Sequence, residues 1–172
     1  MKKALFLFLV PIFLFSFDYK KEYSHNNFEK ICKYGIKHIQ KIRDDENLLT
    51  LVGFSCVKAD SFIYLPTVVT LLKKTTQARQ NSIYFSILYI EKKLLIANII
   101  DGMDISYYKF PYINHPVSIV VNALINNDYK KKNGVVIIKK DDKTYVVYKN
   151  DENKVFIQVY KYKKLQETHW YR

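Results

Sequence analysis

Residues 28–58, FEKICKYGIKHIQKIRDDENLLTLVGFSCVK, contain both cysteines of the chain. The two cysteines lie symmetrically about an acidic run, because Cys32 and Cys56 are equally far from Asp44. In an antiparallel helical hairpin, residues equidistant from the turn lie at the same height. The stretch therefore predicts two antiparallel helices that turn near Asp44 and are joined by a disulfide between Cys32 and Cys56.

The apolar residues of the same stretch support this hairpin. In its first half they recur at spacings of three and four, as on one face of a helix, and lysines occupy the opposite face. The mirror symmetry also places Gly35 opposite Gly53 and Ile36 opposite Val52. A glycine inside a helix costs about 1 kcal/mol relative to alanine. Two glycines at one height therefore predict a close approach of the two helix backbones.

Residues 1–17 have the pattern of a secretory signal peptide. Two lysines follow the initial methionine, and residues 4–17 form an apolar run that is shorter than a membrane-spanning helix needs. Ser16 suits the position before a cleavage site, whereas Leu14 is larger than the small residue preferred two places earlier. An uncleaved anchor is therefore the alternative. After removal of the signal we expect no membrane span and a periplasmic or secreted protein.

Export decides how the cysteines are interpreted. In an oxidising compartment, two cysteines outside any Cys-x-x-Cys or ligand-like cluster favour a disulfide over a metal site or a nucleophile. The four histidines are scattered and show no metal-binding spacing. The sequence therefore predicts a disulfide-bonded protein with no metal and no cofactor.

The formal net charge is +12, and such a charge attracts nucleic acid, anionic lipid or an acidic polymer of a cell envelope. All but three of the 28 basic residues are lysine, whereas arginine is preferred for bidentate contacts with phosphates and bases. The abundance of Lys, Asn, Ile, Tyr and Phe indicates AT-rich coding and a low-GC bacterial genome. We therefore expect no specific nucleic acid partner, since that role requires lysines gathered in one groove.

Residues 77–100 predict a long buried helix. Thr75 or Thr76 starts it, and Gly102 ends it. The predicted buried face comprises Ile83, Tyr84, Ile87, Leu88, Ile90, Leu94 and Leu95. The predicted solvent-facing stripe comprises Ser82, Ser86, Lys92 and Lys93.

The pattern changes period in the C-terminal part of the chain. Three segments either alternate apolar and polar residues or contain runs of β-branched residues, and turn residues separate them: residues 135–139, 144–148 and 154–160. They predict a three-stranded antiparallel β-meander with one face packed on helices. One of these helices is expected to start at Asn114, which would cap it.

The predicted fold class is α+β, with an N-terminal helical hairpin and a long buried helix followed by the meander. We expect a helical subdomain over residues 18–112, and a helix with the meander over residues 113–172, packed as one globular unit. Hydrophobic residues make up 49% of the chain, and there are only four glycines and four prolines, a composition that argues against disorder.

One functional hypothesis is a periplasmic hydrolase that acts on a glycan or a peptide. Glu91 is the one acid on the apolar face of the long helix, where burial would raise its pKa and suit it to general acid catalysis. The alternative is structural: Glu91 lies at the edge of that face, or pairs with a lysine or with Arg79. Its candidate partners as acid or base are His38 and His115, and the hypothesis requires all three side chains to meet in one cleft. The sequence contains no phosphate-binding loop and no Gly-x-Ser-x-Gly elbow.

The favoured hypothesis is a small exported binding or interaction protein of the bacterial cell envelope. Aromatic residues gather around Pro111, where they can grip a ligand or bury their rings in the core. The candidate binding residues are Tyr107, Tyr108, Phe110, Tyr112 and Trp170. This aromatic loop, or an edge of the predicted sheet, would contact an envelope protein or an anionic polymer.

Overall fold

A computed structural model describes residues 17–172, so the predicted signal peptide lies, except for Phe17, outside the described residues. Within this range the chain forms seven α-helices, one short 3-10 helix and five strands, and the fold is α+β, as the sequence predicts. The helices are α1 (Tyr19–Ser24), α2 (Phe28–Lys37), α3 (Ile39–Ile42), α4 (Glu46–Lys58), η1 (Phe62–Tyr64), α5 (Leu65–Val69), α6 (Thr76–Asp101) and α7 (Pro116–Ile125). The strands are β1 (Lys130–Lys132), β2 (Val135–Lys140), β3 (Lys143–Lys149), β4 (Val155–Lys161) and β5 (Lys164–Tyr171).

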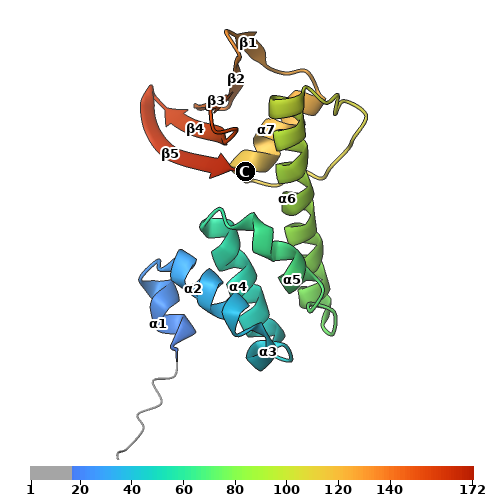
Figure 1. Ribbon diagram of the computed structural model, residues 1–172, viewed down its shortest axis with the longest axis vertical. Coiled ribbons are helices and arrows are strands. Elements are labelled where there is room, and N and C mark those ends of the chain that lie inside the picture. The colour runs from blue at the N-terminus through green and yellow to red at the C-terminus, as the bar shows by residue number, and fades with distance from the viewer. Residues whose placement is uncertain (1–16) are drawn as a thin grey trace, which may run out of the picture.

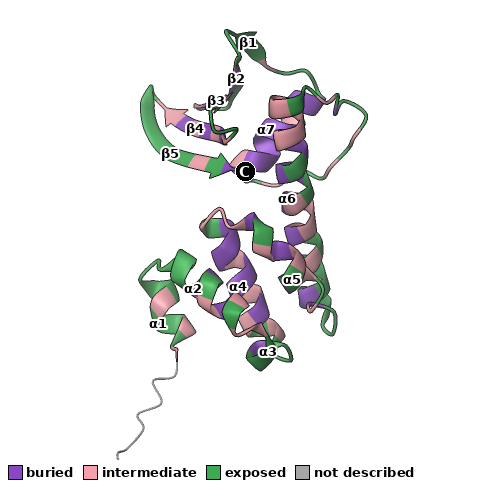
Figure 2. Cartoon of the chain, viewed as in Figure 1, coloured by how far each residue is buried: buried purple, intermediate pink, exposed green. Residues whose placement is uncertain are grey.

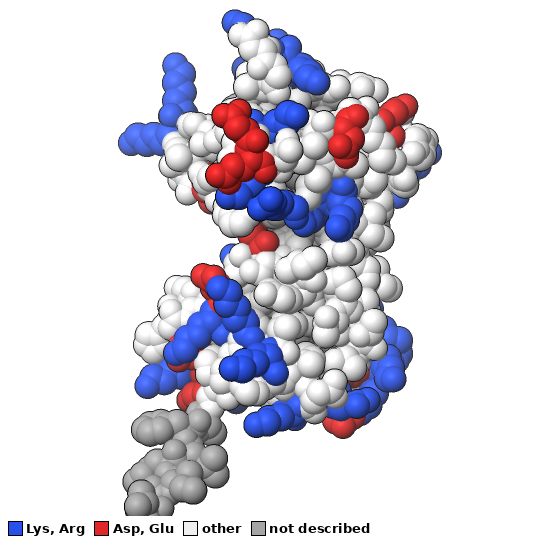
Figure 3. Space-filling model, in the orientation of Figure 1, with Lys and Arg blue, Asp and Glu red and all other residues white. Residues whose placement is uncertain are grey.

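Helix α6 connects two lobes of the molecule (Figure 1). Its first half packs against α4 and α5, and its second half packs against α7 and strands β3 and β4. We call α1 to α5 with η1 the helical lobe, and α7 with the sheet the sheet lobe. Buried side chains occur in both lobes and along α6, so one core extends through the molecule (Figure 2). On the surface, a narrow waist separates the lobes (Figure 3).

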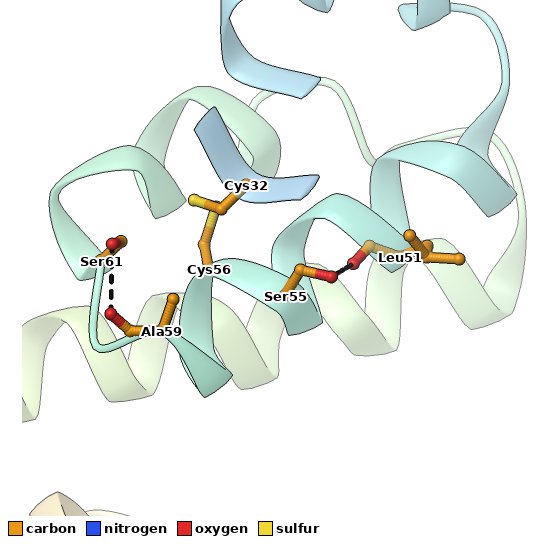
Figure 4. Close-up of a disulfide and its surroundings, with 6 residues drawn as sticks. All are labelled: Cys32, Leu51, Ser55, Cys56, Ala59 and Ser61. Atoms are coloured by element: carbon orange, nitrogen blue, oxygen red, sulfur yellow. Dashed lines mark hydrogen bonds between the residues drawn. A yellow bond between two sulfur atoms is a disulfide. The ribbon is translucent and has the colours of Figure 1, made fainter. Parts of the chain in front are cut away.

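The helical hairpin brings α2 and α4 together, with the short helix α3 between them. Helix α4 starts inside the acidic run, where the Asp45 carboxylate accepts hydrogen bonds from the main-chain N–H groups of Asn47 and Leu48. A disulfide joins Cys32 of α2 to Cys56 of α4, with a Cα–Cα distance of 4.8 Å (Figure 4). The hairpin is thus covalently closed at the end away from its turn.

The two glycines of the hairpin do not face each other, contrary to the sequence prediction. A Cβ atom on Gly35 would lie 2.3 Å from a methyl group of Val52, so α2 does approach α4 closely there. A Cβ atom on Gly53 would instead lie 2.4 Å from the ring of Phe85, which belongs to α6. The reason is that α4 packs on two partners, and Gly53 lies on the side that faces α6.

We expect Gly35→Ala to lower the free energy of unfolding by about 1 to 2 kcal/mol. Overpacking a rigid site costs about 1 to 3 kcal/mol, and this exceeds the gain of up to about 1 kcal/mol that alanine has over glycine in a helix. Val52 is fully buried and stiff, so it cannot yield easily. Urea unfolding checks this, with the exposed Lys37→Ala in the same helix as control. A stabilised Gly35→Ala variant would show that α2 and α4 have room to separate.

Helix α6 has the predicted ends, and its buried face agrees only in part with the prediction, since Leu88, Leu94 and Leu95 are buried as expected. Thr75 caps its start, and Gly102 ends it with a φ of +70°. Ile83 and Ile90, both assigned to the buried face, are 61% and 43% exposed. Lys92, assigned to the solvent-facing stripe, is buried.

The error has a physical cause. Apolar residues surround much of α6, so hydrophobicity alone does not select one face. The structure buries the stripe that contains Asn81 and Lys92, because both find hydrogen-bond partners there. The Asn81 side chain bonds to Thr50, and the Lys92 ammonium donates to the main-chain oxygen of Arg172.

The sheet is an antiparallel meander in the order β1-β2-β3-β4-β5, so the predicted number of three strands is too low. The three predicted strands correspond to β2, β3 and β4. Strands β1 and β5 form the two edges, and nearly all of their residues are exposed. Polar, exposed edge strands protect a sheet from further pairing and carry no alternating apolar pattern.

The start of α7 differs from the prediction by one residue. The cap is His115 and not Asn114, because His115 Nδ1 accepts a hydrogen bond of 3.3 Å from the main-chain N–H of Val117. Pro116 occupies the first helical position, where its missing N–H is not needed. This start places the His115 ring at the waist of the molecule.

Candidate functional site

A cleft of about 410 Å³ lies at the waist, between the two lobes. Its walls come from α4, α6, the start of α7, and strands β3 and β5. The residues that matter for its chemistry are Lys58, Tyr84, His115, Lys143, Tyr145 and His169. We call it the waist cleft.

A histidine clasp borders the waist cleft and joins the two lobes. His169 of β5 places Nδ1 2.9 and 3.0 Å from the two carboxylate oxygens of Asp60, which follows α4. Its Nε2 lies 3.0 Å from a carboxylate oxygen of Glu167. The Tyr171 hydroxyl also donates to Asp60, at 2.8 Å. Asp60 thus fixes the end of β5 to the helical lobe.

The clasp favours a charged imidazole. Burial by itself lowers the pKa of His169, but the hydrogen bonds and charges of Asp60 and Glu167 outweigh it and raise the pKa above its ordinary value. An imidazolium donates from both nitrogens, one to each carboxylate. His169 therefore has no free lone pair with which to act as a general base.

His115 is held in the opposite protonation state. Burial lowers the pKa of His115 to about 4, so the ring is neutral at neutral pH. Because Nδ1 accepts from Val117, the proton of the neutral ring is on Nε2. The ring centroids of His115 and His169 are 6.1 Å apart. Two neighbouring imidazoles thus both present N–H groups and no basic nitrogen.

Glu91 lies in the core and outside the waist cleft. It is fully buried between α6 and α7, where it accepts hydrogen bonds from Ser118 Oγ at 2.9 Å and Asn122 Nδ2 at 3.4 Å. Its other oxygen, Oε2, has no hydrogen-bond partner among the described residues. Burial raises the pKa of Glu91 to about 7, although the Ser118 bond opposes this shift.

The three candidate acid and base residues of the hydrolase hypothesis do not meet. Glu91 is enclosed in the core, and His115 lies in the waist cleft. His38 lies at the junction of α2 and α3, with its ring 4.3 Å from that of Tyr34. The cleft that the hypothesis requires is therefore not formed by these side chains.

The candidate aromatic residues also separate into two places. Tyr107 and Tyr112 are 65% and 59% exposed, whereas Tyr108 and Phe110 are half-buried and pack against the core. Trp170 lies on β5 and is 50% exposed. The aromatic loop does not line the waist cleft, and Trp170 belongs to a different surface.

That surface is the face of the sheet that points away from the helices. Successive strand residues point to opposite faces, and since strands β3 and β4 contact α6 and α7, the alternating buried residues are those that face the helices. The remaining side chains form a face that is only partly buried, which we call the outer sheet face. Its large apolar members are Val135, Ile137, Val146, Tyr148, Phe156, Tyr160, Leu165 and Trp170.

The charges on the outer sheet face have one sign. Lys130 and Lys132 pair with Ile137 and Val135, so they point to this face. Lys139 and Lys154 also lie on it, and the Lys154 ammonium is 5.2 Å from the Trp170 ring centroid. By strand register no acidic residue of the described strands points to this face. Beside this face, in the turn before β4, Glu152 forms an ion pair with Lys154.

Sequence reasoning missed Asp60, Glu167 and His169. Asp60 and His169 are 109 residues apart in the chain, so local patterns do not reveal their contact. One signal was present: Glu167, His169 and Tyr171 recur at a spacing of two, which places polar groups on one face of a strand.

No protein-family model, curated protein or solved structure matches this chain. Within residues 17–172, no helix is long and apolar enough to cross a bilayer. In the same range no three His, Cys, Asp or Glu side chains are placed to hold a metal ion. The buried disulfide is compatible with an extracytoplasmic location.

Proposed function

We propose that this protein is a small exported binding protein of the bacterial cell envelope that docks a protein partner on its outer sheet face. The observation that carries the proposal is the composition of this face, which has an aromatic and aliphatic centre, lysines, and no strand acid. The disulfide supports export. The N-terminal signal pattern points to the same compartment.

The outer sheet face resembles a protein interface in its anatomy. Trp170, Phe156 and Tyr148 lie side by side in register across three strands. The Phe156 and Tyr148 rings are stacked, with their centroids 5.3 Å apart. Interfaces combine an aromatic-rich apolar centre with a polar rim, and uncovered apolar patches on soluble proteins often mark binding sites. Trp170 is the expected anchor, because tryptophan is enriched among residues that dominate binding energy.

Charge selects the kind of partner. A second copy of this chain would bring the four lysines of its own outer sheet face against Lys130, Lys132, Lys139 and Lys154, and like charges repel. A highly charged polymer would use the lysines but would leave the aliphatic side chains of β2 and β3 without contacts. We therefore assign the face to a protein whose docking surface is apolar with acidic residues around it.

The hydrolase alternative receives no support from the geometry. Its three candidate residues lie apart, and the imidazoles of the waist cleft present no basic nitrogen at neutral pH. The carboxyl group of Glu91 is enclosed by protein, so a substrate cannot reach it.

Photo-crosslinking in the native envelope tests the proposal. Leu165, which is 51% exposed on the outer sheet face, is replaced by p-benzoylphenylalanine, and the control places the same group at the 65% exposed Tyr107. We expect one acidic protein as the adduct at position 165 and not at position 107. Trp170→Ala should lower the adduct yield by about tenfold or more, whereas Tyr162→Ala, at a 77% exposed position, should not.

Three outcomes would contradict the proposal. Adducts of equal yield at both positions would move the binding surface to the aromatic loop or make the contact unspecific. A dimer of the chain would show that the lysines do not prevent self-association. A glycan or other polymer adduct without protein would replace the protein partner by an anionic polymer.

A further inference from the structure

We propose that the waist cleft binds a small organic anion, with one carboxylate or phosphate group on an apolar body of about the size of one ring. This site is separate from the outer sheet face, so the proposal does not depend on the proposed function.

The first argument is the set of hydrogen-bond donors that converge on the cleft. Lys58 and Lys143 line it, and neither ammonium group has an ion-pair or hydrogen-bond partner within residues 17–172. The hydroxyls of Tyr84 and Tyr145 also line it without such a partner in that range. Tyr145 as a whole is only 2% exposed, and its hydroxyl is not enclosed by protein but keeps access to the cleft. A bound anion would supply acceptors for these groups.

The second argument is the start of α7, which opens into the cleft. Asn114, His115 and Pro116 line the cleft, and the first turn of a helix carries partial positive charge. The neutral His115 ring, which also lines the cleft, carries its proton on Nε2. Anions are stabilised at such helix starts. The helix start and the buried Tyr145 are independent features that favour the same sign of ligand charge.

The third argument is the balance of charge in the cleft. Among the described lining residues Glu167 is the only acid, and its carboxylate is already engaged by His169. The clasp holds one imidazolium between two carboxylates, those of Asp60 and Glu167, and the positive charges of Lys58 and Lys143 exceed the one negative charge that remains. The electrostatic potential of the cleft is therefore positive, and a cation would be repelled.

The walls and the volume define the rest of the ligand. Phe54, Val57 and Ile119 provide apolar surface beside the donors. A volume of about 410 Å³ lies in the range of small-molecule sites, which combine apolar walls with a few placed polar groups. A ring-sized apolar body with one anionic group fits within this volume and can contact these walls.

Titration with three probes tests this proposal. Benzoate and phenyl phosphate carry the proposed anion, and benzamide is the neutral isostere of benzoate. Binding is followed by main-chain amide chemical shifts in NMR spectra. We expect the anions to shift the amides of Tyr145 and of the first turn of α7, and benzamide to bind about tenfold more weakly, since a hydrogen bond to a charged group contributes about 1.5 to 3 kcal/mol. The anion that binds with the higher affinity shows whether the site prefers a carboxylate or a phosphate group.

Variants distinguish anion binding in the waist cleft from anion binding on the outer sheet face. Lys143→Gln and Lys58→Gln should each weaken anion binding about tenfold, whereas Lys139→Gln, on the outer sheet face, should leave it unchanged. Equal binding of benzoate and benzamide would overturn the proposal. So would shifts confined to the outer sheet face, equal effects of the Lys143 and Lys139 substitutions, or no binding of either anion at millimolar concentration.

Discussion

Raising the pH from about 5 to about 8 is expected to lower the contribution of Glu91 to the free energy of unfolding by about 3 kcal/mol. Burial raises the pKa of this carboxyl group to about 7 in the folded protein, from 4.5 for an exposed glutamate. Below pH 4.5 Glu91 is protonated in both the folded and the unfolded protein, and above pH 7 it is ionised in both. Between these values only the folded state holds the proton, so each pH unit costs about 1.4 kcal/mol of stability.

The surroundings of Glu91 explain why ionisation is costly there. Ser118 and Asn122 donate to one oxygen, and Oε2 has no partner among the described residues. The nearby Tyr84 stays neutral, because burial and the charge of Glu91 raise its pKa. No described cation forms an ion pair with Glu91. The carboxyl group is therefore a hydrogen-bonded acid in the core at mildly acidic pH.

Glu91→Gln tests this expectation, because glutamine keeps the shape of the protonated acid and does not ionise. Urea unfolding at both pH values should show a stability difference between wild type and variant that grows by about 3 kcal/mol toward high pH. Comparing the two proteins removes the contribution of other titrating groups, including His169. Glu29→Gln, at an exposed residue paired with Lys33, serves as control. Parallel pH profiles of wild type and Glu91→Gln would refute the raised pKa.

The sequence predicts the parts of the fold that are set by local signals. The turn of the hairpin follows from the acidic run, because Asp45 caps α4. The ends of α6 follow from Thr75 and Gly102, whose roles need only neighbouring backbone groups. In each case the residue acts within a few positions of itself in the chain.

Features that depend on tertiary contacts are less accessible to sequence reasoning. Lys92 of α6 is buried against the sequence prediction, because it finds its partner at Arg172, which is 80 residues away. Strand β5 was missed because an edge strand needs no alternating apolar pattern. The histidine clasp is likewise beyond local patterns, because it forms only where β5 lies beside the end of α4.

Removing the Cys32–Cys56 bond is expected to lower the free energy of unfolding by about 3 kcal/mol. The bond links residues 24 positions apart, and closing a loop of this length restricts the unfolded chain by about that amount in the chain-entropy model. The double variant Cys32→Ala, Cys56→Ala should show this loss in urea unfolding. The reduced wild-type protein should unfold at a similar urea concentration, because both lack the same restriction.

Thiol labelling establishes whether the bond is present in the protein as it is made. Both cysteines are fully buried, so they would escape alkylation in the folded protein whether or not they are bonded. The protein must therefore first be unfolded without reductant. We then expect no alkylation of either cysteine, and alkylation of both after reduction. Labelling of both thiols before reduction would show that the bond does not form.

Because α2 contacts the rest of the chain mainly through α4, loss of the bond should loosen α1 and α2 before it affects the sheet lobe. Hydrogen exchange of the double variant should therefore accelerate first in residues 19–37.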